Sequence, residues 1–264
     1  MFVTERLARF VELLAKAERV LAFTGAGVST GSNIPDFRGP NGVWRTRAPV
    51  ELPEFVRSEE ARVDYWRYKL EGYPAFRDAK PNPAHLALVE LERLGKLEAV
   101  VTQNIDGLHR AAGTSQERLV ELHGTNAEAE CMACRVREPI ERALDDFAKT
   151  ERPPRCTRCD GLMKPGVIMF GQMLVDADLE RARKAATRAD FVMALGSSLV
   201  VTPAADVPLV ALRRRVPYVI VNRGATPHDV LATLTLDDDV GRVLPLVVAG
   251  AFAEQRSPSS GGPA

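Results

Sequence analysis

The sequence predicts an α/β protein in which helices flank a parallel sheet, interrupted by a small module that contains every cysteine of the chain. Short apolar runs typical of buried strands alternate with segments whose apolar residues recur at helical spacing. A long stretch rich in Gly and Pro follows the first of these runs, and four cysteines interrupt the later ones. With 264 residues, 45% of them hydrophobic, the chain is long enough for one large domain with a sizeable core and a small satellite.

The charge balance excludes a general electrostatic attraction to nucleic acids or anionic membranes. Lys+Arg and Asp+Glu both number 35, so the formal net charge is zero. No stretch approaches the roughly 20 apolar residues that a membrane-spanning helix requires. We therefore expect a soluble cytoplasmic protein that binds neither nucleic acid directly nor a membrane. We expect it to be a monomer, although no feature of the sequence fixes the oligomeric state.

The N-terminal part contains a helix, a buried strand and a long insertion. Apolar residues recur at helical spacing over residues 4–17 and predict a helix there. The apolar run at 19–24 predicts a buried strand that ends at Gly25. Residues 25–81 are crowded with Gly, Pro and Asn, so we expect a long functional loop or lid with only short helical pieces.

An alternation of strands and helices typical of parallel sheets follows the insertion. A helix is expected over residues 84–94, and strands over 97–102, 118–122, 166–170, 191–195 and 218–221, with helical segments before the last two. The alternation stops at Cys131 and resumes at Gly166, which indicates an inserted module over residues 127–165. The main domain then comprises residues 1–126 and 166–253. Residues 254–264 are mostly Ser, Gly and Pro, and we expect them to be disordered.

Glycines follow the first predicted strand in the segment from Gly25 to Gly31. Such a turn permits the backbone to approach a pyrophosphate closely, although the spacing departs from the usual dinucleotide-binding pattern at Thr30. A plain tight turn is the alternative. The next segment places an acid, an aromatic ring and a guanidinium side by side, which suits a dinucleotide but also fits an ordinary surface loop with an ion pair: Asp36, Phe37 and Arg38.

Polar residues also follow two later strands of the predicted sheet. Gln103, Asn104, Ile105 and Asp106 lie at the carboxyl end of a parallel strand, the edge where open α/β sheets bind ligands. His123 ends the next strand and is followed by a glycine, which permits a ligand to approach closely. A lone histidine at a strand end is more often structural, so the residues alone leave both roles open.

The four cysteines form two C-x-x-C pairs, Cys131 with Cys134 and Cys156 with Cys159. Two such pairs have the spacing of a tetrahedral zinc site. A catalytic zinc ion keeps an open position and normally recruits histidine or carboxylate, so four thiolates indicate a structural ion. A redox-active pair is the alternative.

Seven motifs, taken together and in order, resemble those of the sirtuin family: GAGVSTGSNIPDFRG, TQNIDGLH, LHG, the paired C-x-x-C, VIMFG, GSSLVVTPAA and VNRG. They span residues 25–224, and seven motifs in register over such a length have a negligible chance of coinciding. The resemblance implies a Rossmann-like catalytic domain that binds NAD⁺, a cofactor-binding insertion of loops and helices over residues 25–81, and an inserted zinc-binding module. It also implies an NAD⁺-dependent protein-lysine deacylase.

The resemblance assigns roles to individual residues. It implies that NAD⁺ is bound by Gly25, Ala26, Gly27, Thr30, Asp36, Phe37, Arg38, Gln103, Asn104, Ile105, Asp106, Gly196, Ser197, Ser198, Asn222, Arg223 and Val240. His123 corresponds to the general base, with Asn104 and Asp106 orienting the nicotinamide. The substrate backbone is expected to pair with the VIMFG segment, through Val167, Met169, Phe170 and Gly171.

The chemistry implied by the resemblance is acyl transfer from a lysine side chain to ADP-ribose, with release of nicotinamide. An imidazole with a reference pKa near ~6.5 suits the base that activates a ribose hydroxyl, a contribution of about 10²–10⁴ in rate. An ADP-ribosyltransferase or an NAD⁺ glycohydrolase would use the same pocket. A sensor that binds NAD⁺ without turnover is a third possibility, which the presence of His123 disfavours.

Two residues depart from the family pattern, and a third feature bears on the acyl group. Asn33 stands where glycine is usual, and asparagine is well suited to a positive φ. Gln172 stands where an acid is usual, which removes a negative charge beside the peptide groove. Sirtuins that remove succinyl groups resemble one another in a Tyr-x-x-Arg pair, and here the residue three positions after Tyr65 is Tyr68. We therefore expect an apolar acyl pocket that disfavours succinyl-lysine at least tenfold, lined by Phe37 and Ile105 with Tyr65, Trp66 and Tyr68 as further candidates, and with Arg67 directed away.

Overall fold

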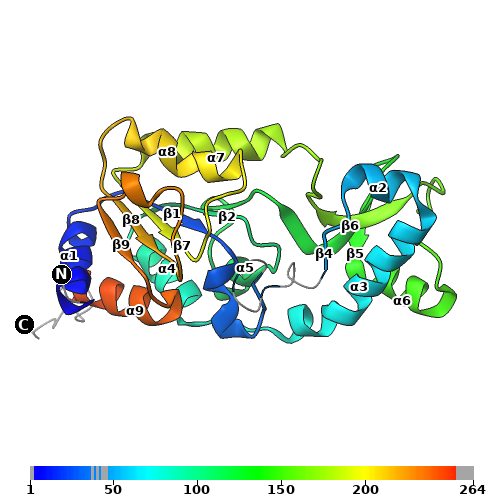
Figure 1. Cartoon of the computed structure of the whole chain (residues 1–264), viewed down its shortest axis with the longest axis horizontal. Helices are drawn as coiled ribbons and strands as arrows, with labels where there is room; N and C mark the ends of the chain where they lie inside the picture. The colour runs from blue at the N-terminus through cyan, green and yellow to red at the C-terminus, as the bar shows by residue number, and fades with distance from the viewer. Residues whose placement is uncertain (1–2, 37–38, 40–41, 43–46, 254–264) are drawn as a thin grey trace, which may run out of the picture.

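The structure is a computed structural model that describes residues 3–36, 39, 42 and 47–253. It has a large lobe with a six-stranded sheet and a small lobe with a three-stranded sheet (Figure 1). The large sheet is parallel throughout, in the order β3-β2-β1-β7-β8-β9. Its strands are β1 (Val20–Thr24), β2 (Leu97–Thr102), β3 (Leu119–Glu121), β7 (Phe191–Leu195), β8 (Tyr218–Val221) and β9 (Leu234–Leu236). This is the doubly wound order, which reverses between β1 and β7.

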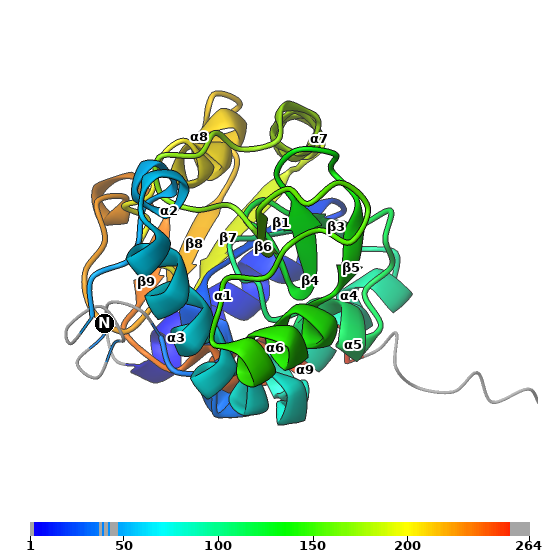
Figure 2. The same ribbon diagram turned by 90° about the vertical axis from the view of Figure 1, so that its right-hand side faces the viewer.

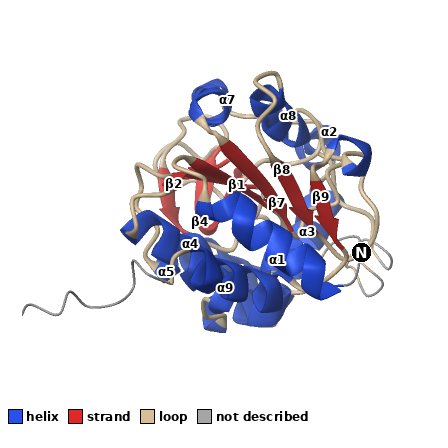
Figure 3. Ribbon diagram, turned by 90° about the vertical axis from the view of Figure 1, so that its left-hand side faces the viewer, coloured by secondary structure: helices blue, strands red, loops and turns tan. Residues whose placement is uncertain are grey.

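Helices cover both faces of this sheet (Figure 3). One face packs against α1 (Val3–Ala15), α4 (Pro83–Arg93) and α9 (Val240–Ala251), and the other against α7 (Asp176–Arg188) and α8 (Val207–Leu212). Side chains of β1 alternate between the two cores, since Ala22 belongs to the first and Leu21 and Phe23 to the second. The apolar runs of the sequence predict β1, β2, β3, β7 and β8 correctly, but not β9, which has only the two buried residues Leu234 and Leu236.

The small lobe combines the cysteine module with two helices from the insertion (Figure 2). Its elements are β4 (Gly124–Cys131), β5 (Arg137–Pro139), β6 (Met163–Val167), α6 (Ile140–Thr150), α2 (Leu52–Arg57) and α3 (Glu59–Asp78). Phe55 of α2 and Trp66 of α3 share one hydrophobic core with Ala129 of β4 and Met163 of β6. The small lobe therefore takes in more of the chain than the predicted module of residues 127–165.

Two expectations about these segments are wrong. The run at 166–170 does not resume the parallel sheet, because residues up to Val167 form β6, which pairs antiparallel with β4. The insertion contains a helix of 20 residues, α3, rather than only short helical pieces. Ser58 caps this helix by accepting a hydrogen bond from the Ala61 amide at 3.1 Å. The interior Pro74 hides its length from sequence analysis, since proline normally ends a helix.

Short elements complete the chain: α5 (Leu108–Ala112) and the 3₁₀ turns η1 (Ala26–Val28), η2 (Thr30–Ser32), η4 (Ala204–Asp206) and η5 (Asp229–Leu231). Among the described helices, none combines the length and the apolar character needed to cross a membrane. The C-terminal tail that we expect to be disordered, residues 254–264, lies outside the described residues.

Candidate active site

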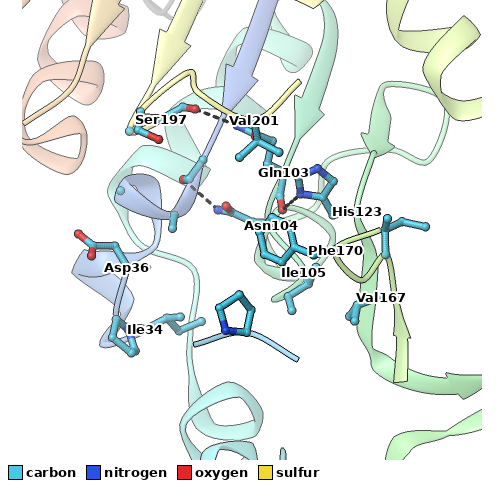
Figure 4. Close-up of a pocket in the computed structure, with 18 of the residues that line it drawn as sticks. Ile34, Asp36, Gln103, Asn104, Ile105, His123, Val167, Phe170, Ser197 and Val201 are labelled. Carbon is cyan, nitrogen blue, oxygen red and sulfur yellow. Dashed lines mark hydrogen bonds between the residues drawn. The ribbon is translucent and has the colours of Figure 1, made fainter. Parts of the chain in front are cut away.

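A cavity of about 1570 Å³ lies between the lobes at the carboxyl edge of the large sheet (Figure 4). The segment after each strand of that sheet contributes a lining residue: Gly25 after β1, Gln103 after β2, His123 after β3, Gly196 after β7, Asn222 after β8 and Val240 after β9. The small lobe supplies the opposite wall from α3 and from the segment after β6. The strand order reverses at this edge, which makes the cavity the expected ligand crevice of the fold.

The glycine loop after β1 touches the loop after β7 backbone to backbone. The Gly27 amide donates a hydrogen bond to the Gly196 carbonyl at 2.8 Å. A Cβ on Gly27 would lie 2.7 Å from Gly196 Cα, and a Cβ on Gly25 would lie 2.7 Å from the Gly196 carbonyl oxygen. These glycines are therefore needed for the contact between the two loops, in addition to any approach to a pyrophosphate.

Two 3₁₀ turns, rather than a regular helix, follow this loop. The predicted residues Gly25, Ala26, Gly27 and Thr30 line the cavity. Asn33 ends the second turn with φ of 63°, which confirms that asparagine here adopts the left-handed conformation. Asp36 also lines the cavity, and its Oδ1 accepts a hydrogen bond from the Gly39 amide at 2.8 Å. Phe37 and Arg38 lie outside the described residues.

A buried hydrogen-bond network ties the segment after β2 to the glycine loop. The Asn104 Nδ2 donates to the Gly25 carbonyl and to Ser29 Oγ, both at 3.1 Å. Ser29 Oγ in turn donates to Asp106 Oδ2 at 2.7 Å. Gln103, Asn104 and Ile105 line the cavity, but Asp106 is not among its lining residues. Asp106 is therefore bonded to the Ser29 that contacts Asn104 rather than placed on the cavity wall.

His123 lines the cavity with its ring held in one orientation. Its Nδ1 lies 3.0 Å from the carbonyl oxygen of Gln103, as the dashed line in Figure 4 marks. A carbonyl oxygen only accepts hydrogen bonds, so Nδ1 carries the proton in the neutral ring. Nε2 is then the basic nitrogen, which is the arrangement that a general base requires.

The residues expected on the adenosine side surround the other end of the cavity. Gly196, Ser197, Ser198, Asn222, Arg223 and Val240 all line it. Gln103 Nε2 donates to Ser197 Oγ at 2.8 Å and so joins the segment after β2 to the segment after β7 (Figure 4). Arg223 pairs with Asp239 at 2.9 Å, and Asp239 caps α9 by accepting from the Arg242 amide.

The segment that starts at the end of β6 forms a further wall. Val167, Met169, Phe170 and Gly171 all line the cavity. The Ile168 amide donates to the His123 carbonyl at 2.8 Å, so this wall is fixed directly to the residue after β3. Gln172 Oε1 accepts from the Met169 amide at 3.3 Å, and this bond orients the side chain that stands where an acid is usual.

The four cysteines converge in the small lobe. Their Sγ atoms all lie within 4.8 Å of one another, with Cys131 to Cys159 at 3.5 Å and Cys134 to Cys156 at 3.7 Å. Tetrahedral zinc with bonds of about 2.3 Å places sulfur atoms about 3.8 Å apart, whereas a disulfide needs about 2.05 Å. A Cβ on Gly161 would lie 2.9 Å from the Cys131 Sγ, so this glycine keeps space for the thiolates. The geometry fits a structural zinc site rather than a redox pair.

Comparison with known proteins assigns the chain to a family. The model of the Sir2 family matches residues 25–203. The chain belongs to the Sir2 family. It is 40% identical over 236 residues to NAD-dependent protein deacetylase 1 of Bradyrhizobium diazoefficiens, covering 89% of this chain and 92% of that protein. It is 43% identical over 247 residues to NAD-dependent protein deacetylase 1 of Pyrobaculum aerophilum, covering 92% and 94%.

Solved Sir2 structures resemble the whole architecture of this Sir2-family chain. One Sir2 enzyme matches with a TM-score of 0.85 and 37% identity, over 96% of this chain and all of the other. A Sir2 variant in complex with a deacetylated p53 peptide and 3′-O-acetyl-ADP-ribose matches with a TM-score of 0.84 and 37% identity, over 94% and 98%. The two-lobed Rossmann-like fold is therefore that of Sir2 enzymes.

The small-lobe wall of this Sir2-family cavity differs from the expected apolar pocket. Ile105, Tyr65 and Tyr68 line it as expected, but Lys69 and Arg47 line it too. Trp66 is fully buried in the small-lobe core and does not reach the cavity. Arg67 pairs with Asp64 on the exposed side of α3, as its angular position predicts.

Several residues of this site carry no signal in the sequence. Ser29 is fully buried and joins Asn104 to Asp106, yet a serine in a glycine-rich turn is unremarkable by itself. Lys69 and Asn126 come from α3 and β4 and meet only through tertiary folding. A half-buried lysine that lines a cavity cannot be told from a surface lysine without the fold.

Proposed function

We propose that the protein is an NAD⁺-dependent protein-lysine deacylase that acts on acyl-lysine side chains of proteins or peptides. The observation that carries this proposal is the placement of His123, with Nδ1 hydrogen-bonded to the Gln103 carbonyl and the residue lining a cavity to which all six strand ends contribute. NAD⁺, when bound, supplies the ribose that receives the acyl group and the nicotinamide that leaves. His123 Nε2 accepts a proton from a ribose hydroxyl, and Nδ1 remains protonated against the Gln103 carbonyl.

The other residues of the cavity bind and orient. Asn104, fixed by Ser29 and the Gly25 carbonyl, holds its carboxamide oxygen at the nicotinamide end of the cavity. Asp106 is a positioning residue that acts through Ser29. The segment from Val167 to Gly171 offers an extended edge to the backbone of an acyl-lysine peptide, by strand addition. Ser197, Asn222 and Arg223 support the adenosine side.

Product analysis separates deacylation from the alternatives. An acetyl-lysine peptide incubated with NAD⁺ is expected to give nicotinamide, free-lysine peptide and O-acetyl-ADP-ribose in equal amounts, measured by mass spectrometry. Peptide-independent nicotinamide release with ADP-ribose as the product would instead identify a glycohydrolase. ADP-ribosylated protein would identify a transferase. The wall from Val167 to Gly171 favours deacylation, because neither alternative needs a surface for an extended acyl-lysine peptide.

The cysteine cluster supplies structure rather than chemistry. It lies in the small lobe, and none of its four residues lines the cavity. Zinc would be held by Cys131, Cys134, Cys156 and Cys159 and would link the end of β4 to the segment before β6. Four reduced thiols dedicated to one metal support a cytoplasmic location. We also propose a monomer, which light scattering after gel filtration tests directly.

A further inference from the structure

Two cations lie on the small-lobe wall of the cavity, and neither has a role in the proposed reaction. Lys69 of α3 donates from Nζ to Asn126 Oδ1 at 2.8 Å, and Nζ lies 5.5 Å from the centre of the Tyr65 ring. Arg47 lies with its guanidinium carbon 4.8 Å from the centre of the Tyr68 ring. We call the group that these residues form the distal cluster: Arg47, Tyr65, Tyr68, Lys69 and Asn126.

The cations of the distal cluster have no acidic partner among the described residues. No Asp or Glu oxygen of the described chain lies within 4.0 Å of Lys69 Nζ or of the Arg47 guanidinium, whose Nη2 donates only to the Asp64 carbonyl. Nearby cations are paired, as Arg67 is with Asp64 and Arg135 is with the buried Glu130. Both side chains are half-buried on the cavity wall, where withdrawal of a charge from water without a counter-ion is costly, so the two cations can accept an anion.

The electrostatic environment of Lys69 points the same way. Burial and the nearby Lys164 lower the pKa of Lys69 to about 8. The groups around it are the Tyr65 ring of α3, with Tyr68 beside that tyrosine, the side-chain amide of Asn126 in β4 and Lys164 of β6. None of these groups is an anion at neutral pH, because burial raises the pKa of both tyrosines. A carboxylate entering the cluster would restore the missing charge balance.

The distal cluster adjoins the segment that carries the reaction. The backbone amide of Asn126 donates to the Ile105 carbonyl at 2.8 Å. Asn126, which accepts from Lys69 through its side chain, is therefore bonded to the residue that follows Asn104. Ile105, His123 and the members of the distal cluster all line the same cavity. An acyl-lysine with its carbonyl near His123 can therefore extend the end of its acyl chain to the distal cluster within that cavity.

Helix geometry explains why Lys69 serves here and Arg67 does not. Residues four apart lie on one face of a helix, which places Lys69 beside Tyr65. Residues two apart are separated by about 200°, which places Arg67 on the exposed side, paired with Asp64. The expectation of an apolar pocket followed from Tyr68 at the position of the usual arginine and from the direction of Arg67, and it did not consider Lys69 or Arg47.

We propose that the distal cluster binds the terminal carboxylate of a dicarboxylic acyl group, so that the protein accepts succinyl- or glutaryl-lysine as well as neutral acyl-lysines. This specificity rests on the proposed deacylase function. The ammonium of Lys69 provides the charge and up to three hydrogen-bond donors, and the Tyr65 and Tyr68 hydroxyls provide further donors. The proposal reverses the sequence-based expectation that succinyl-lysine is disfavoured.

The decisive comparison is between succinyl and butyryl on the same peptide, because the two chains have similar length and differ in charge. The wild-type protein is expected to show kcat/KM for succinyl-lysine equal to or above that for butyryl-lysine. In Lys69→Met, which keeps the length of the side chain without its charge, the succinyl-to-butyryl ratio is expected to fall at least tenfold. Lys69→Arg should retain most of the ratio. Arg67→Met, on the exposed side of the same helix, should leave it unchanged.

The outcomes separate this proposal from the proposed function. Removal of acetyl and butyryl groups with succinyl more than a hundredfold slower would overturn the distal-cluster proposal alone. A ratio in Lys69→Met within twofold of wild type would also overturn it. If no acyl-peptide is turned over, the deacylase function fails. Fluorescence anisotropy of labelled succinyl- and butyryl-peptides with wild type and Lys69→Met then decides the cluster, since equal affinities in both proteins would refute it.

Discussion

The two walls of the cavity are built in different ways. The large-lobe wall is held by backbone contacts, such as the bond from the Gly27 amide to the Gly196 carbonyl, and by buried polar side chains such as Asn104. The small-lobe wall also has a backbone contact, from the Ile168 amide to the His123 carbonyl, but its part from α3 and β4 consists of side chains, and Lys69 is held there by a hydrogen bond to Asn126. Side chains of this part can be exchanged with less effect on the fold than the backbone contacts of the large-lobe wall. We therefore expect cofactor chemistry to depend on the large lobe and acyl selectivity on the small lobe.

The largest expected effect is that of losing the metal, which should disrupt the small lobe and leave the large lobe folded. Structural zinc contributes about 10–16 kcal/mol in model peptides, so Cys131→Ser is expected to lower the zinc content and the melting temperature together. The small-lobe core around Trp66 should lose amide protection while β1 and β7 retain it, as hydrogen exchange can measure. Absence of stoichiometric zinc from the purified wild type, by elemental analysis, would refute the site.

Removal of the general base tests the large-lobe wall. His123→Ala should lower kcat for deacetylation by about 10²–10⁴ and leave the melting temperature nearly unchanged, because His123 is only partly buried. NAD⁺ affinity, measured by calorimetry, should remain close to that of wild type. Retention of more than a tenth of the wild-type turnover would contradict the role of His123.

The backbone contact between the loops after β1 and β7 predicts an intermediate effect. Gly27→Ala places a methyl group 2.7 Å from Gly196 Cα, where only backbone atoms could move, and overpacking of this kind costs about 1–3 kcal/mol. The matched control is Gly72→Ala in α3, where an added Cβ meets no atom within 4 Å. That change should raise stability by up to about 1 kcal/mol. Equal urea midpoints for the two variants would show that the loops adjust freely.

The smallest expected effect is a pH dependence of acyl selectivity. The pKa of Lys69 is lowered to about 8, so the site is charged below that pH and loses its charge as the pH rises through it. Lys164, whose pKa is also lowered to about 8, faces Lys69, and its own loss of charge spreads the transition. The succinyl-to-butyryl ratio should fall severalfold from pH 7 to pH 9. Any titration of His123 cancels in this ratio, and Lys69→Met should show no fall.

Sequence reasoning succeeded where short-range patterns determine the structure. The strand ends, the glycine loop and the cysteine pairs are contiguous motifs, and in the structure Gln103, Asn104 and His123 line one cavity while the four thiols lie together. It failed where the outcome depends on packing between distant segments. The start of the strand predicted at 166–170 belongs to the small lobe instead, because Lys164 and Pro165 of β6 pair with Glu130 and Ala129 of β4. Lys69 faces the cavity only because α3 packs on the cysteine module.

The strand order has a consequence for how the chain is made. Val20 of β1 pairs with Leu97 of β2 on one side and with Phe191 of β7 on the other. During synthesis the central strand therefore waits for most of the polypeptide to leave the ribosome before its second edge is covered. Pairings so remote in sequence form slowly, and an uncovered apolar strand invites aggregation. The reversal of strand order that creates the ligand crevice also means that β1 is not covered on both edges until β7 has been synthesised. We expect chaperones to bind the nascent chain until β7 has emerged.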